Sequence, residues 1–176
     1  MRVRKIAYTG LSLLTTLLVI GCSSTGDLTG KKLDPLTGVT VSRASEPVVL
    51  YRDDSAYAAH ARNFVYMGPV EVNRMGHYSY YLWFGIWNTI RDDERMASDR
   101  DGFESVVLFV YGNPLPLDIG GWTLESIGVS EPVYVKPVAG ASDDYYPVTL
   151  DQIRLIAAAR DVELRAGKGR SSTYLP

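Results

Sequence analysis

Acid–base or hydrolytic chemistry in this chain depends on a few side chains. The only histidines are His60 and His77, and either could act as a general base. Two aspartate pairs, Asp92-Asp93 and Asp143-Asp144, could hydrolyse a polymer if they converged in one cleft. The chain contains no HExxH, GxSxG, Walker A or GxGxxG pattern. We therefore expect no catalytic residue, metal ligand or cofactor, and a polymer hydrolase is the least favoured function.

A basic start followed by an apolar run indicates a targeting segment at the N-terminus. Arg2, Arg4 and Lys5 precede the uncharged stretch 6–20. This stretch is shorter than the roughly 20 apolar residues of a membrane-spanning helix and has the length typical of a signal peptide. Cys22, the only cysteine of the chain, follows it closely. A single cysteine excludes an internal disulfide framework and a zinc site built from cysteines.

The segment Val19-Ile20-Gly21-Cys22 resembles the lipobox of bacterial lipoproteins. The resemblance implies that residues 1–21 are a signal peptide, that Cys22 is acylated and that the lipid bilayer is a partner. Ser23 stands where an aspartate usually signals retention in the inner membrane. For a Gram-negative source, this implies an outer-membrane lipoprotein that faces the periplasm. The alternative is a signal-anchor helix with a buried cysteine.

The charge balance limits the possible partners. The 176 residues include 18 basic and 20 acidic side chains, and 46% of the residues are hydrophobic. This composition is typical of a folded globular protein. Without residues 1–21 the chain carries 15 basic and 20 acidic residues. Because there is no basic excess to neutralise phosphates, the composition argues against nucleic acid as the main partner.

An aromatic segment over residues 78–89 is the most unusual part of the sequence. Tyr81, Trp83 and Trp87 share one face of a strand with this register, and the opposite face is also apolar. We expect a central strand, covered on one face by a second sheet and on the other by the C-terminal helix. The alternative is that these three residues, with Trp122, form a platform that binds sugar rings or an apolar ligand.

The elements that must position these residues are mostly strands. Residues 22–45 are rich in Ser, Thr, Gly and Lys, and we expect a flexible linker there. The strands are expected at 48–51, 63–73, 78–89, 103–111, 115–119 and 134–138, with turns at 74–77 and 112–114. Thr149 and Gln152 form the pattern of a capping box, which predicts a helix over 150–160. A strand at 162–166 follows, or else the helix continues to Gly167.

These patterns predict one β-rich domain over residues 46–176. Its class is mostly antiparallel β, a sandwich or a strongly curved sheet, with one C-terminal helix, and therefore α+β. The favoured function is a membrane-anchored, non-enzymatic interaction or accessory module that binds a protein of the cell envelope. The alternative is a module that binds a glycan or small ligand through the aromatic sheet face.

Overall fold

The computed structural model describes residues 29–54, 60–89, 102–167 and 172–176. The strands are β1 (Thr29–Leu33), β2 (Thr40–Ala44), β3 (Val48–Asp53), β4 (Arg62–Arg74), β5 (His77–Asn88), β6 (Ser105–Val110), β7 (Asn113–Asp118), β8 (Asp144–Val148), β9 (Val162–Ala166) and β10 (Ser172–Tyr174). A short 3₁₀ helix, η1 (Leu124–Ile127), precedes β8, and the α-helix α2 (Leu150–Ala157) follows it. The expected mostly β, α+β class is confirmed. Neither helix of these residues has the length and apolar character that a membrane crossing requires.

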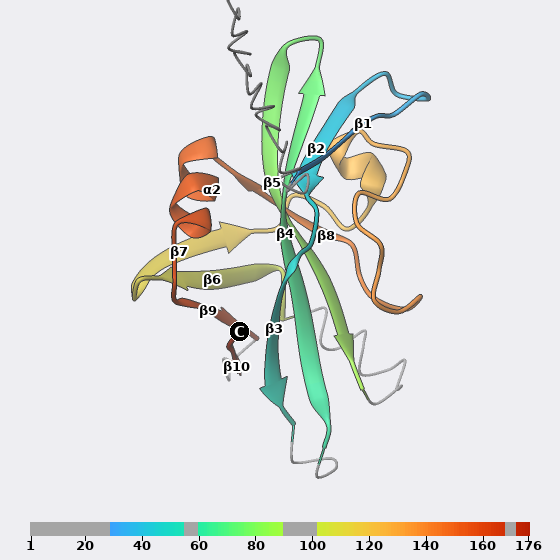
Figure 1. Ribbon diagram of the computed structural model, residues 1–176. Helices are drawn as coiled ribbons and strands as arrows, with labels where there is room; N and C mark the ends of the chain where they lie inside the picture. Colours follow the sequence, from blue (N-terminus) through green and yellow to red (C-terminus); the bar gives the residue numbers. More distant parts are fainter. Residues whose placement is uncertain (1–28, 55–59, 90–101, 168–171) are drawn as a thin grey trace, which may run out of the picture.

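The strands form two antiparallel sheets that cross each other (Figure 1). The first has the order β1-β2-β4-β5-β8, and β3 also pairs with β4. The long strand β4 binds β3 along its first half and β2 along its second half. The second sheet has the order β10-β9-β6-β7. Figure 1 shows that the first sheet extends beyond the second, and that the β1–β2 and β4–β5 hairpins lie in this extension.

Backbone bridges join the two sheets at both edges. Tyr51 of β3 and Leu175 exchange N–H···O bonds of 2.8 and 3.0 Å. At the other edge, Gly121 pairs with Tyr145 of β8, three residues after β7 ends. These bridges satisfy backbone groups that would otherwise be open to pairing with another chain.

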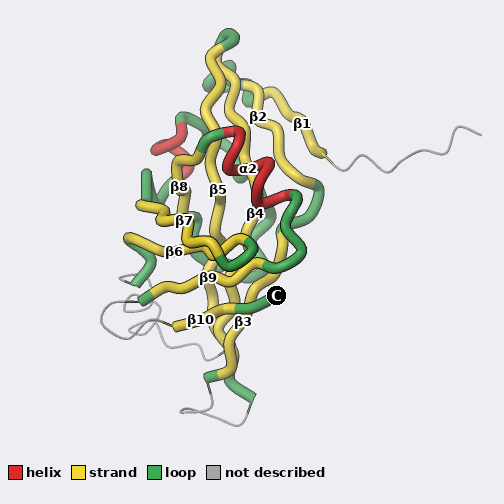
Figure 2. The backbone as a smooth tube through the Cα atoms, turned by 90° about the vertical axis from the view of Figure 1, so that its left-hand side faces the viewer, coloured by secondary structure: helices red, strands yellow, loops and turns green. Residues whose placement is uncertain are grey.

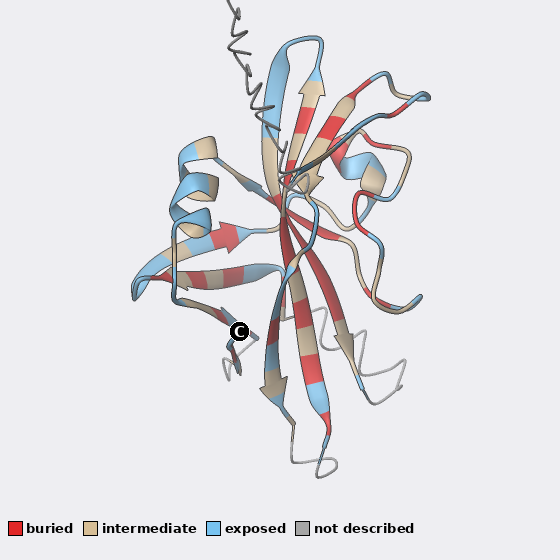
Figure 3. Ribbon diagram, viewed as in Figure 1, coloured by how far each residue is buried: buried red, intermediate tan, exposed pale blue. Residues whose placement is uncertain are grey.

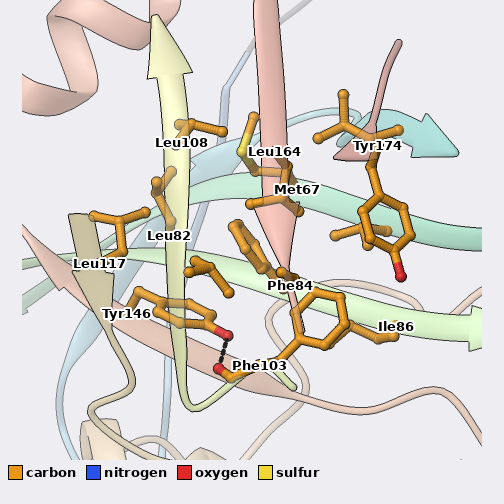
Figure 4. Packing of buried hydrophobic residues seen from close by; sticks show 14 of the residues in the cluster. Met67, Leu82, Phe84, Ile86, Phe103, Leu108, Leu117, Tyr146, Leu164 and Tyr174 are labelled. Atoms are coloured by element: carbon orange, nitrogen blue, oxygen red, sulfur yellow. Dashed lines mark hydrogen bonds between the residues drawn. The ribbon is translucent and has the colours of Figure 1, made fainter. Parts of the chain in front are cut away.

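The main core lies between the two sheets (Figure 4). It joins Leu82 and Phe84 of β5 to Leu108 of β6 and Leu164 of β9, all at most 2% exposed. Tyr146 is also fully buried there, and its hydroxyl donates a hydrogen bond to the carbonyl oxygen of Phe103. The alternating apolar residues of β5 and β6 thus bury one face of each strand, as their period of two predicts.

A second core lies on the opposite face of the first sheet, under the segment 123–134. Val70 and Trp83 of the sheet meet Ile127, Val129 and Tyr134 of that segment. The expectation that the C-terminal helix covers this face is wrong. Helix α2 lies on the same side as the second sheet (Figure 2), and its Ile156 packs against the main core.

Three further expectations about elements are wrong. Residues 29–33 and 40–44 are not a flexible linker, because they form β1 and β2 and pair into the first sheet. Residues 134–138, where a strand was expected, are irregular. The Tyr134 ring packs on the face of the first sheet against Trp83. The turn expected at 112–114 lies at Tyr111-Gly112, and Asn113 already begins β7. Positive φ angles of 52° and 76° at this pair fit a two-residue hairpin turn.

Local signals predicted the C-terminal elements well. Thr149 accepts a hydrogen bond from the Gln152 amide at 3.2 Å, and the Gln152 side chain accepts one from the Thr149 amide at 2.7 Å. This capping box begins α2, which ends at Ala157. The strand expected at 162–166 is confirmed as β9, so the single helix to Gly167 is excluded.

Buried residues gather along the middle of β4 and β5, whereas the tip of their hairpin is exposed (Figure 3).

Candidate functional site

Trp83 is a core residue in this structure. Its side chain is fully buried, its ring stacks on Tyr134 with centroids 4.8 Å apart, and its Nε1 donates to Asp143 at 2.9 Å. Asp143 also forms an ion pair of 2.6 Å with Lys136. This environment favours the central-strand interpretation, because no face of the indole is open to a sugar ring. It also gives Asp143 a structural role in place of a catalytic one.

Tyr134 fastens the segment 123–134 to the sheet. Its hydroxyl donates to the carbonyl of Pro69 at 2.9 Å and accepts from the amide of Ala44 at 3.1 Å. Its ring lies directly over Gly68, where a Cβ atom would approach the ring and hydroxyl to 2.5 Å. Burial raises the pKa of Tyr134 to about 12, so the hydroxyl keeps the proton that it donates to Pro69 even at moderately alkaline pH. The Arg43 guanidinium carbon lies 5.1 Å from the ring centroid.

The other aromatic residues of the expected platform lie apart from Trp83. Trp87 is half-buried and stacks on Phe64 with centroids 4.8 Å apart, and its buried Nε1 has no hydrogen-bond partner among the described residues. Trp122 is half-buried beside the bridge that joins β8 to the end of β7. Tyr81 packs at the edge of the second core. The four aromatic residues therefore do not form one flat surface, and a binding role for Trp87, Trp122 or Tyr81 stays a prediction.

The candidate acid–base residues do not form a catalytic arrangement among the described residues. His77 and Tyr81 line a polar hollow of about 370 Å³ with Glu125 and Ser126. The Ser126 hydroxyl donates to the carbonyl of Thr123 at 2.5 Å and not to the imidazole. A serine held in this way has no base to take its proton.

The remaining candidates are dispersed. Asp144 is buried as the first residue of β8, where it accepts from the Ser142 hydroxyl at 2.8 Å. His60 is exposed in the turn two residues before β4. Within the described ranges, no three His, Cys, Asp or Glu side chains gather to hold a metal ion. Cys22 and the pair at 92–93 lie outside the described residues.

The structure instead shows a pocket that sequence reasoning missed. It has a volume of about 380 Å³ and lies between the β1–β2 hairpin and residues 129–135. Its wall includes Gly30, Lys32, Arg43, Glu131, Val133 and Tyr134, and we call it the Arg43 pocket. This volume is in the range of small-ligand sites. The pocket combines three cationic residues, Lys31, Lys32 and Arg43, with buried apolar residues, which is the chemistry of a site for an amphipathic anion.

Asp34 holds the two sides of the Arg43 pocket together. Its carboxylate accepts from the amide and hydroxyl of Ser130, both at 2.6 Å, and from the amides of Leu36 and Thr37 at 3.0 and 3.2 Å. The hydroxyl and amide of Ser130, followed by the turn amides, hold the pKa of Asp34 well below its usual range. All of these donors favour the ionised form. The carboxylate is therefore a structural anion and is saturated by protein donors.

Replacing Asp34 with asparagine is expected to destabilise the fold in a pH-dependent way. The depressed pKa means that the ionised carboxylate adds stability above the unfolded pKa of about 4, and that this stability is lost as pH falls toward the folded pKa. The gap in free energy of unfolding between wild type and Asp34→Asn should be full at pH 7 and shrink below about pH 4. Urea titrations of both chains from pH 7 to pH 2 measure it. The exposed Asp118→Asn is the matched control. A gap that does not change with pH would show that the carboxylate charge is not involved.

Little in the sequence could have indicated the Arg43 pocket. Its two walls are contributed by residues about one hundred positions apart, such as Lys32 and Glu131. The only local signal is the run Gly30-Lys31-Lys32, which is common in solvent-exposed segments. Pairing of β1 with β2 gives these residues a defined position, and that pairing was not expected.

The chain has no detectable similarity to known proteins. No protein-family model, no curated protein and no solved structure matches it. The fold and the pocket therefore have to be interpreted from their own chemistry.

Proposed function

We propose that the chain is a lipid-anchored protein of the bacterial envelope whose β domain acts as a non-enzymatic interaction module. The anchor is the acylated Cys22 that the lipobox resemblance implies. In a Gram-negative source the proposed location is the outer membrane, with the domain facing the periplasm. The role of interaction module is supported by the absence of a catalytic arrangement among the residues that the structure describes.

The observation that carries the proposal is the short distance along the chain between the anchor and the first strand. Strand β1 begins at Thr29, so only residues 23–28 lie between it and Cys22. A fully extended chain spans about 3.3–3.6 Å per residue. The Cα atom of Thr29 is therefore within about 25 Å of the anchored cysteine. This tether is far shorter than one ending at residue 45, and it keeps the domain close to the bilayer.

A short tether also orients the domain. The hairpin of β1 and β2, and the Arg43 pocket beside it, would face the membrane side. Helix α2 lies on the other face of the first sheet, with Leu155 47% exposed. A protein partner in or near the membrane would thus meet the β1–β2 hairpin first, whose Leu33 and Leu36 are 62% and 83% exposed.

Site-specific crosslinking in cells tests this function. A photoreactive residue is placed at Leu33 of the full-length chain, or at Leu155 as the control, and captured proteins are identified by mass spectrometry. The proposal predicts an envelope protein captured from position 33, not from position 155, and lost when Cys22 is replaced by alanine. The same capture from the unanchored chain, or none from a chain that is acylated and folded, would contradict it.

A further inference from the structure

One edge of the Arg43 guanidinium makes no hydrogen bond to the residues that the structure describes. Nη1 of Arg43 donates to the carbonyls of Ala44 and Ser45, each at 3.1 Å. Among the described residues no carboxylate lies within ion-pair distance of Arg43, and its Nε and Nη2 atoms make no hydrogen bond. The ring of Tyr134 holds the guanidinium in place. A fixed guanidinium with a free Nε–Nη2 edge is suited to bidentate binding of an oxyanion.

Gly30 keeps the approach to this edge open. A Cβ atom at Gly30 would lie 3.7 Å from Nε and 3.8 Å from Cζ of Arg43. Any longer side chain would therefore occupy the space in front of the guanidinium. Gly30 lies in strand β1, pairs with Arg43 in the register of β1 and β2, and has no positive φ angle. The backbone conformation at this position does not require glycine. The main structural effect of having glycine there is the open space in front of the guanidinium.

A second cation lies on the same wall. Lys32 follows Gly30 by two residues on the same face of β1 and forms an ion pair with Glu131 on the opposite wall. The Lys32 side chain is 68% exposed, and an exposed pair of this kind is weak and easily exchanged. The other carboxylate in the pocket, Asp34, is already saturated by its donors. Lys31 also lines the pocket, so an incoming anion meets three cationic residues and one displaceable carboxylate.

The rest of the pocket is apolar. Val41, Val129 and Val133 are at most 7% exposed and line it together with the ring of Tyr134. At about 380 Å³ the pocket is larger than an inorganic anion needs, and the space beside the cations suits a hydrocarbon or ring. The ligand that fits both halves carries a compact, multiply charged oxyanion and an apolar body.

We propose that the Arg43 pocket binds a phosphate ester, with the phosphate on Arg43 and Lys32 and the ester group against the valines and Tyr134. Arg43 offers a planar fork and Lys32 a point charge in the same pocket, and this combination favours phosphate over a monoanionic carboxylate. The phosphate could belong to a lipid headgroup or to a free phosphomonoester. The inference stands on the pocket and does not require the anchor, so a chain with Cys22→Ala should bind equally well.

Calorimetric titration of the full-length acylated chain in a neutral detergent tests this site. The titrants are phenyl phosphate, inorganic phosphate, phenol and the soluble short-chain lipid dihexanoyl phosphatidic acid. Phenyl phosphate is expected to bind more tightly than inorganic phosphate or phenol, because each of these lacks one half of the ligand. Tighter binding of the lipid would identify a headgroup site, and tighter binding of phenyl phosphate a site for free esters.

Four variants locate the binding. Arg43→Gln is expected to weaken phenyl phosphate binding about 10- to 100-fold, as loss of a charge-assisted hydrogen-bond pair does. Gly30→Leu should abolish binding while leaving every charge in place. Glu131→Gln should tighten binding, because it removes the competing carboxylate. Arg165→Gln, another arginine over an aromatic ring but in the second sheet, is the matched control and should have no effect.

Two results would overturn the proposal. One is no binding of phenyl phosphate or the lipid at millimolar concentration by a folded chain. The other is binding that Arg43→Gln and Gly30→Leu leave unchanged. Because Gly30→Leu retains all charges and lies on an edge strand, it keeps the test decisive if Arg43→Gln fails to fold.

Discussion

Replacing Gly68 with alanine is expected to lower the free energy of unfolding by about 3–5 kcal/mol. The added Cβ atom would lie 2.5 Å from the ring and hydroxyl of Tyr134. That ring cannot move aside without loss, because its hydroxyl bonds to Pro69 and Ala44 and its face stacks on Trp83. Overpacking costs about 1–3 kcal/mol, and each lost hydrogen bond adds about 1 kcal/mol. Urea denaturation followed by tryptophan fluorescence measures the change.

Gly30→Ala is the matched control for this prediction. It makes the same substitution in a strand of the same sheet, but its Cβ has only ordinary contacts of 3.7 Å or more. We expect it to change stability by less than about 0.5 kcal/mol. In a Tyr134→Ala background, Gly68→Ala should cost much less, because the clash is gone. If Gly68→Ala in the wild-type background were as mild as Gly30→Ala, the described packing of Tyr134 would be wrong.

Trp83→Ala is expected to lower the free energy of unfolding by a similar amount, about 3–5 kcal/mol, as the loss of other large buried aromatic residues does. The substitution empties the centre of the second core and removes the ring on which Tyr134 stacks. It also removes the Nε1 donor from Asp143, although Lys136 still pairs with that carboxylate. Thermal and urea unfolding of the full chain measure the loss.

Comparison with Trp87→Ala separates a core role from a surface role. Trp87 is half-buried and stacks on one aromatic neighbour, so its loss should cost less than that of Trp83. Iodide should quench the fluorescence of Trp83 least, because its side chain is fully buried. A stable Trp83→Ala chain with strong iodide quenching of Trp83 in the wild type would favour the ligand platform instead.

The elements that the sequence predicted correctly are those whose signals are local. The Thr149–Gln152 capping box defined the start of α2, and the first of the two alternatives after it, a strand at 162–166, is observed as β9. The two-residue turn at Met75-Gly76 lies within the expected β4–β5 hairpin. In each case the stabilising contacts are between residues close in sequence.

The elements that were missed depend on distant residues. Strand β2 contains the apolar residue Val41 among polar ones, and its place in the sheet comes from pairing with the second half of β4. Tyr134 was assigned to a strand, yet its position depends on Gly68, whose missing side chain makes room for the ring. Neither relation is visible as a pattern along the chain, because β propensity is set largely by tertiary packing.

The Arg43 pocket was not predicted from the sequence. Acylation of Cys22 stays a prediction, which rests on a motif of contiguous residues. The Arg43 pocket has two walls separated by about one hundred residues, and one of its features is the absence of a side chain at Gly30. The many aromatic residues of β5 suggested a binding surface as an alternative, whereas Trp83 is fully buried in the structure.

The mass of the N-terminal peptide of the full-length protein, isolated from the membrane fraction of expressing bacteria, tests the central claim most directly. A lipid anchor that is separated from β1 by the six residues 23–28 predicts that the chain begins at Cys22 and carries acyl chains on it. Cys22→Ala should leave the chain uncleaved and without acyl chains. A wild-type chain that retains residues 1–21, or begins elsewhere without a lipid, would contradict the anchored-module account.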